Sequence, residues 1–228
     1  MQEMSPTTIV RLDLNDQVYA AIKERLLTRE FAGGTRVSLQ SLADDLGVSR
    51  SPIAHALTRL VTEGLVVSDR RGYLVRPLTV ELMEEAHEAR LALELHAAEL
   101  TVGELDLEQL NEFRRLMVRT IEPVEGAEIV DTRKYMLVNK EFHEYQVDLA
   151  QNSFISDMYR KLSIHQLMER TILMLGVHAA GGSSAEHEEI YAAFVAGDLE
   201  RSRAALRANV ATGKRIVRQA IAQSGGTL

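Results

Sequence analysis

Ser49, Arg50 and Ser51 open a short amphipathic segment and have the composition of a helix start that reads DNA bases. The N-terminal residues of a docked recognition helix reach base edges, and an arginine can bond a guanine through two parallel hydrogen bonds. A serine at such a place caps the helix, contacts a phosphate, or does both. The residues favour a base contact for Arg50, and the alternative is a solvated surface arginine.

A helix-turn-helix over residues 37–63 is the element that would position these side chains. Gly47 separates two short amphipathic stretches, and Gly64 follows the second, as is typical of a helix end. A preceding helix is predicted from Asp13 or Asn15 to about Arg29. The apolar faces of the three segments are formed by Val18, Ala21, Ile22, Leu26, Leu42, Ala43, Leu46, Ile53, Ala56, Leu57, Leu60 and Val61.

Two β-rich runs at 65–68 and 73–76 follow directly and predict a hairpin, which after a helix-turn-helix is a wing. The tip of this wing holds Arg70, Arg71 and Gly72. This composition suits close approach to a phosphate backbone or a narrow groove. Further DNA contacts are predicted, each against the alternative of a solvated surface group, for Arg36, Gln40, Arg59, Arg70 and Arg71.

Beyond residue 79 the pattern is helical throughout, so the fold class is mainly α, with a winged helix-turn-helix followed by an antiparallel six-helix bundle. The stretch 176–183 is the one long loop and could gate a cavity. We divide the chain into a tail (1–9), a DNA-binding domain (10–78), an effector-binding and dimerisation domain (79–222) and a second tail (223–228). Helices are expected at 80–101, 106–121, 130–150, 152–175, 184–196 and 198–222.

The bulk composition of the 228 residues excludes several classes of protein. The absence of cysteine excludes a disulfide framework and thiolate metal sites, and it fits a cytoplasmic location. No apolar run approaches the roughly 20 residues of a membrane span, and the N-terminus does not read as a signal peptide. The net charge of −7 is uneven, because residues 9–78 carry ten Lys/Arg against eight Asp/Glu while residues 79–228 carry sixteen against twenty-four.

The stretch 34–77, GTRVSLQSLADDLGVSRSPIAHALTRLVTEGLVVSDRRGYLVRP, resembles the winged helix-turn-helix of the GntR family of bacterial transcription regulators. The following region resembles the FCD ligand-binding domain of the FadR-like branch. The resemblance is carried by RLALE (90–94), NKEFH (139–143), EH (186–187), GD (197–198) and Ala204. The resemblance spans about residues 10–222. It departs at Pro52-Ile53-Ala54-His55, where the family usually has a base-reading arginine in place of Ala54.

The resemblance implies a homodimer that binds a pseudo-palindromic double-stranded DNA operator and responds to a small effector, such as an organic acid, in its helical domain. It gives Arg50 the base-reading role and turns Arg90 inward to hold an effector carboxylate. Read from spacing alone, Arg90 and Glu94 form a surface ion pair one turn apart.

The resemblance also implies a divalent metal site, for zinc, nickel or a similar ion, at four positions. Asn139 and His143 share a helix face, His187 matches a third ligand, and Asn209 stands where the family usually has histidine. This set lacks an anion. Three interpretations are open: a metal completed by waters and an effector carboxylate, a metal-free polar effector site of the same residues with Arg90, or buried histidines in the core. We expect His165 and His178 on a helix surface or in a loop.

Other functions are compatible with parts of the pattern. A di-metal bundle enzyme needs two Glu-x-x-His motifs, and the chain offers one such spacing, Glu84 to His87, so no enzyme is predicted. The alternatives to a metabolite-responsive regulator are a metal-only sensor and a constitutive DNA binder with a vestigial pocket.

Overall fold

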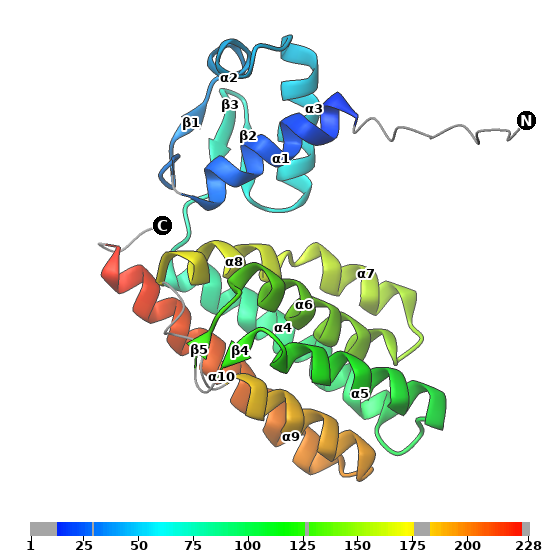
Figure 1. Ribbon diagram of the computed structural model, residues 1–228. Coiled ribbons are helices and arrows are strands. Elements are labelled where there is room, and N and C mark those ends of the chain that lie inside the picture. Colours follow the sequence, from blue (N-terminus) through cyan, green and yellow to red (C-terminus); the bar gives the residue numbers. More distant parts are fainter. Residues whose placement is uncertain (1–12, 29, 126–127, 176–182, 225–228) are drawn as a thin grey trace, which may run out of the picture.

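The computed structural model describes residues 13–28, 30–125, 128–175 and 183–224. Figure 1 shows two units joined by one connection, a small mixed unit formed by the N-terminal part and a larger helical unit. The predicted fold class, mainly α with a winged helix-turn-helix before a helical domain, is confirmed. The predicted loop at 176–183 and both predicted tails lie almost entirely outside the described residues.

The N-terminal unit contains α1 (Leu14–Leu27), α2 (Leu39–Leu46) and α3 (Arg50–Thr62). The side chain of Asp13 accepts the backbone N–H of Asn15 and so caps α1, as predicted. Gly47 ends α2 in the left-handed region with φ of 66°, which separates α2 from α3. The apolar faces of the three helices meet in one core that contains Ile22, Leu42, Ile53, Leu57 and Leu60.

The wing is a small antiparallel sheet of β1 (Arg36–Val37), β2 (Val66–Asp69) and β3 (Gly72–Val75), in the order β1-β3-β2. Arg70 and Arg71 form the turn between β2 and β3, which confirms the predicted hairpin. The short strand β1 was not predicted. It pairs Arg36 with Leu74 and so fixes the loop before α2 to the base of the wing.

The helical unit contains α4 (Val80–Thr101), α5 (Leu107–Ile121), α6 (Thr132–Asp148), α7 (Ser153–Lys161), α8 (Ile164–Leu175), α9 (Ser183–Val195) and α10 (Leu199–Gln223). The single helix predicted over 152–175 is therefore wrong. It breaks at Ser163, where φ is +52°. The break lies at the contact with the DNA-binding unit, where a Cβ on Gly64 would be 3.2 Å from the Cβ of Ser163.

A short hairpin of β4 (Val124–Glu125) and β5 (Glu128–Ile129) between α5 and α6 was also not predicted. The two strands have two residues each, which is too short to give an alternating pattern in the sequence.

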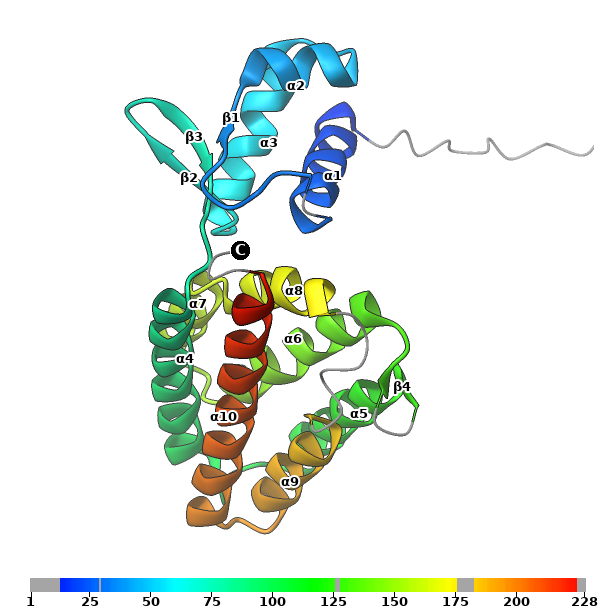
Figure 2. The ribbon, with the colours of Figure 1, turned by 90° about the vertical axis from the view of Figure 1, so that its left-hand side faces the viewer.

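The helices α4 and α10 lie side by side through the helical unit, as Figure 2 shows. The buried face of α4 carries His87, Arg90 and Glu94, and the facing side of α10 carries Asn209 and Gly213. These polar residues recur at three- and four-residue spacing, so each set faces the interior of the bundle. A polar cluster thus lies inside a domain whose other buried residues are mostly apolar.

Gly213 allows the close approach of α10 to α4. A Cβ there would lie 2.7 Å from Nε2 of His87, a fully buried ring whose Nδ1 is 2.6 Å from the carbonyl oxygen of Met83. Gly→Ala in a helix ordinarily stabilises by about 1 kcal/mol. We expect Gly213→Ala instead to destabilise the protein by about 1–3 kcal/mol, as overpacking of a core does.

Urea unfolding monitored by circular dichroism measures this effect. The double variant Gly213→Ala with His87→Ala removes the ring that the new methyl group meets, so Gly213→Ala should be less destabilising in that background. An increase in stability for Gly213→Ala alone would contradict the close packing described here.

Candidate functional site

The N-terminus of α3 is exposed, as a DNA-reading helix requires. Arg50 is the first residue of α3, and Ser49 occupies the capping position without a capping hydrogen bond from its side chain. Arg50 and the wing arginines Arg70 and Arg71 are exposed and form no ion pair with any described residue. Ser51 is exposed beside them. Three guanidinium groups and two serine hydroxyls are therefore available to a nucleic acid.

Three of the other predicted DNA contacts are held within the protein. Arg36 donates to both carboxylate oxygens of Asp69, at 3.0 and 2.7 Å, and this contact holds the pKa of Asp69 at about 2. Gln40 donates to Asp44 at 2.7 Å. Arg59 donates to Asp16 and lies 3.7 Å from the centre of the Tyr19 ring. The structure thus separates Arg36, Gln40 and Arg59 from the three arginines that have no ion-pair partner among the described residues.

Gly72 follows the wing turn with φ of 111°, a conformation that disfavours other residues. The backbone N–H of Arg71 donates to Asp69 at 2.7 Å, so the side chain that holds Arg36 also shapes the turn. Arg36 therefore supports the turn end of the wing through Asp69.

A second cluster lies inside the helical unit, around Arg90 of α4. The guanidinium is 1% exposed and Glu94 is fully buried, so their ion pair is not on the surface. Arg90 Nε donates to Glu94 Oε1 at 2.8 Å, and the hydroxyl of Tyr159 donates to the same oxygen at 2.7 Å. Burial is the largest single influence on Glu94 and would raise its pKa, but Arg90 and His143 together outweigh burial and hold that pKa well below its usual range.

The other end of the guanidinium binds two predicted ligand residues. Arg90 Nη2 lies 2.9 Å from His143 Nε2 and 2.9 Å from Asn209 Oδ1. A guanidinium only donates, so Nε2 of His143 is unprotonated and its ring proton is on Nδ1, 3.2 Å from Glu94. Burial, together with the charge of Arg90, lowers the pKa of His143 to about 4, which keeps the ring neutral.

The remaining predicted ligands take different places. His187 Nε2 lies 3.2 Å from His143 Nε2, and its Nδ1 lies 3.1 Å from the hydroxyl of Thr120. Asn139 turns away from this group, with its Nδ2 3.4 Å from Nδ1 of His165. The structure thus brings His143, His187 and Asn209 around Arg90, while Asn139 borders the cluster from the side.

The expectation that His165 lies at a surface is wrong, because it is only 5% exposed and its Nε2 lies 3.3 Å from the Tyr159 hydroxyl. The break at Ser163 starts a new helix and turns this ring inward. His178 lies outside the described residues. Sequence reasoning missed Tyr159 and His165, and it treated Glu94 only as a surface partner of Arg90. The four-residue spacing of Arg90 and Glu94 was the one available signal.

The cluster does not fit a resident divalent metal while Arg90 holds this position. A zinc ion would lie about 2.0–2.2 Å from nitrogen and oxygen ligands, in space that Arg90 Nη2 fills between His143 and Asn209. The nearest carboxylate, that of Glu94, is engaged by the guanidinium. Among the described residues there is no group of three or more His, Cys, Asp or Glu that could hold a metal.

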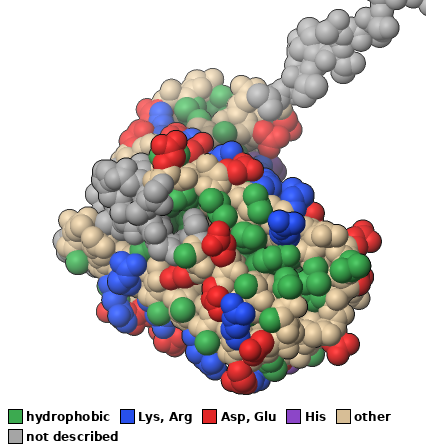
Figure 3. Space-filling view, turned by 60° about the horizontal axis from the view of Figure 1, so that its bottom comes forward, with side chains coloured by type: hydrophobic (Ala, Val, Ile, Leu, Met, Phe, Trp, Pro, Cys, Tyr) green, Lys and Arg blue, Asp and Glu red, His purple; other side chains and the backbone are tan. Residues whose placement is uncertain are grey.

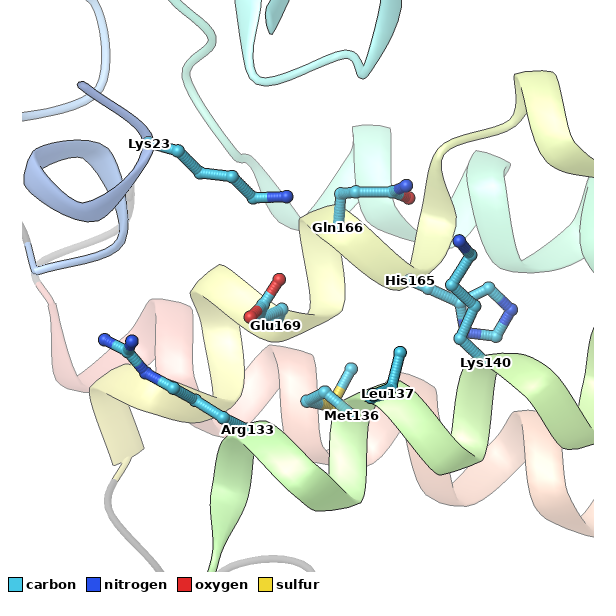
Figure 4. A pocket seen from close by; sticks show the side chains of 8 residues that line it. All are labelled: Lys23, Arg133, Met136, Leu137, Lys140, His165, Gln166 and Glu169. Carbon is cyan, nitrogen blue, oxygen red and sulfur yellow. The ribbon is translucent and has the colours of Figure 1, made fainter. Parts of the chain in front are cut away.

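Two cavities adjoin the cluster and differ in size. The inner one is about 20 Å³ and is bordered by Arg90, Asn139 and Asn209, with room for about one water. The outer one is about 210 Å³ and lies between the two units, where Figure 4 shows Lys23 of α1 facing side chains of α6 and α8. His165 lines the outer cavity and also contacts Asn139 and Tyr159. Its ring therefore lies between the outer cavity and the buried cluster.

Two family models match the two units of the chain. Residues 14–75 match the bacterial regulatory proteins of the gntR family, and residues 85–212, more than half of the chain, match the FCD domain. The chain belongs to the GntR family, in the branch that carries an FCD domain. It is a DNA-binding transcription regulator and not an enzyme.

Several transcription regulators are similar to this chain over about two thirds of its length or more. The uncharacterised regulator YdhC of Bacillus subtilis (strain 168) is 28% identical over 176 residues, which cover 77% of this chain and 78% of YdhC. The gluconate operon transcriptional repressor of the same organism is 26% identical over 153 residues, covering 67% of this chain and 61% of that repressor.

The solved structure of E. coli McbR/YncC has a TM-score of 0.68 to this chain at 23% identity, covering 92% of this chain and 99% of the other. At that identity the likeness establishes the fold alone. No described helix has the length and apolar character that a membrane-crossing segment requires.

Proposed function

We propose that this GntR regulator binds a pseudo-palindromic operator as a homodimer in the cytoplasm. The observation that carries the proposal is the set of three exposed guanidinium groups, those of Arg50, Arg70 and Arg71, that form no ion pair with any described residue. In each protomer the N-terminus of α3 would read base edges in the major groove, and the wing would contact the phosphate backbone. Since Ala54 replaces a family arginine, Arg50 and the wing would carry more of the sequence preference than α3 alone.

Exposed hydrophobic side chains support the dimer. Leu107 is 79% exposed and Phe154 is 80% exposed in the single chain, and Val118 on α5 is also exposed. Figure 3 shows hydrophobic side chains gathered on one face of the molecule. A gathering of exposed apolar side chains such as the one in Figure 3 is typical of an interaction site.

The effector would be a small organic acid bound at the cluster of Arg90, Asn139, His143, His187 and Asn209. Arg90 supports this proposal, since a guanidinium can hold a carboxylate through two hydrogen bonds. The inner cavity of about 20 Å³ is too small for an organic acid, so binding requires the cluster to open. Nη2 of Arg90 would then exchange His143 and Asn209 for the ligand, and this difference would favour one arrangement of the dimer over another.

Repression is the proposed mode of regulation, because the relative from Bacillus subtilis is the repressor of a gluconate operon. The alternatives are a metal-only sensor and a constitutive binder with a vestigial pocket. These three possible functions can be distinguished by measuring operator affinity while the full chain is titrated with organic acids and, separately, with divalent metals. An acid should change the affinity of the metabolite-responsive regulator, a metal should change that of the metal sensor, and neither should affect the constitutive binder.

Fluorescence anisotropy with DNA from upstream of the protein's own gene tests operator binding. We expect a specific complex whose affinity falls steeply with salt, because the wing arginines release counterions from the phosphates. A titration in which this DNA and an unrelated duplex of equal length bind equally well would overturn the proposal.

A further inference from the structure

The buried guanidinium of Arg90 occupies the position of a central cation. Its Nε donates to Glu94, and its Nη2 donates to the two neutral acceptors His143 Nε2 and Asn209 Oδ1. A third neutral acceptor, the sulfur of Met168, lies 3.9 Å from Nη1. One carboxylate and three uncharged acceptors thus surround one positive charge. Ligands surround a bound metal ion in the same way.

We propose that Arg90 is the permanent internal cation of this cluster and that it takes the place of a bound metal ion. The charge of Arg90 balances that of Glu94, so the buried group is neutral as it stands. A divalent ion added beside Arg90 would bring two further positive charges. Glu94 is already paired with Arg90, and the carboxylate of Glu186, the other acidic group that contacts the cluster among the described residues, accepts from Asn209 Nδ2 and from the hydroxyl of Thr212. Burying unpaired charge is strongly unfavourable.

The same geometry indicates what removal of Arg90 would create. The Nε2 atoms of His143 and His187 are 3.2 Å apart. Two nitrogens bound at 2.0–2.1 Å to one tetrahedral ion lie about 3.3 Å apart. Asn209 Oδ1 contacts the same Arg90 nitrogen as His143 Nε2 does, so it borders the space that Arg90 would vacate. Glu94, freed from the guanidinium, would then supply the compensating charge and accept from Nδ1 of His143, as carboxylates do behind metal-bound histidines.

The residues around Arg90 are those of the proposed effector site, but the cation role of Arg90 depends on neither an effector nor DNA. We expect the wild-type protein to be metal-free and Arg90→Leu to gain a metal site. Loss of Arg90 leaves Glu94 buried and unpaired, so Arg90→Leu should also have a lowered melting temperature. A metal ion that replaces the missing charge should restore part of that loss.

The experiment uses the chelator-treated full chain, titrated with Co²⁺ and followed by visible absorption and by thermal unfolding. For the wild type we expect no ligand-field band and no change in melting temperature with one equivalent of Co²⁺. For Arg90→Leu we expect one Co²⁺ per chain, bound at least about tenfold more tightly, and a rise in melting temperature.

Two matched variants distinguish the effect of the positive charge of Arg90 from the effect of the space that its side chain fills. Arg90→Lys keeps a buried positive charge and should stay metal-free, and Arg90→Leu with His143→Ala should lose the new site. If Arg90→Leu does not fold, Arg90→Leu with Glu94→Gln removes both charges and should bind Co²⁺ more weakly but still with one ion per chain. A wild-type protein that binds one Co²⁺ through His143, or an Arg90→Leu variant as metal-free as the wild type, would overturn the inference.

Discussion

Glu94→Gln is expected to lower the free energy of unfolding by about 3–5 kcal/mol, the largest stability change that we predict for a single side chain. The substitution keeps the shape of residue 94 but removes its charge. Arg90, which is 1% exposed, is then left as a buried cation without an anion. The hydroxyl of Tyr159 loses a charged acceptor at the same time. Urea unfolding of the full chain measures the difference.

Glu99→Gln is the matched control, because it lies on the same helix and pairs with an arginine, Arg203, at the surface. Exposed ion pairs contribute little to stability, so this variant should unfold at nearly the wild-type urea concentration. Equal stability of the Glu94→Gln and Glu99→Gln proteins would show that the buried ion pair described here is absent in solution.

Arg50→Ala is expected to weaken specific operator binding by about 1–3 kcal/mol for each half-site, which is the discrimination that a bidentate base contact provides. The side chain leads α3, is exposed, and forms no ion pair with the described residues, so its loss should not disturb the fold. Anisotropy measurements on the operator and on an unrelated duplex separate the two contributions. We expect a large loss on the operator and a small one on the other duplex.

Arg59→Ala provides the comparison for this experiment. Arg59 is on the same helix and is also exposed, but it is held by Asp16 and the Tyr19 ring. Its removal should leave operator affinity close to that of the wild type. If Arg59→Ala lost as much operator affinity as Arg50→Ala, base reading could not be assigned to the N-terminus of α3.

Prediction from the sequence succeeded where local interactions determine the structure. Asp13 caps α1, Gly47 ends α2, and the pair Arg70-Arg71 turns the wing, because each feature depends on residues within a few positions of it. It failed at Ser163, where the helix over 152–175 breaks. That break lies against Gly64 of the other unit, and a contact of this kind leaves no local pattern in the sequence.

The sequence by itself determined the order of the elements and the helix-turn-helix with its wing, and it supplied the candidate residues for contacts with DNA, a metal or an acid. Only the tertiary structure decided which side of α4 is buried, so only it made Arg90 and Glu94 an internal pair. It also joined them to His143 of α6, brought in His165, and left Arg36 and Arg59 with acidic partners. Spacing along a helix fixes which residues share a face, whereas burial and partners depend on the helices packed against that face.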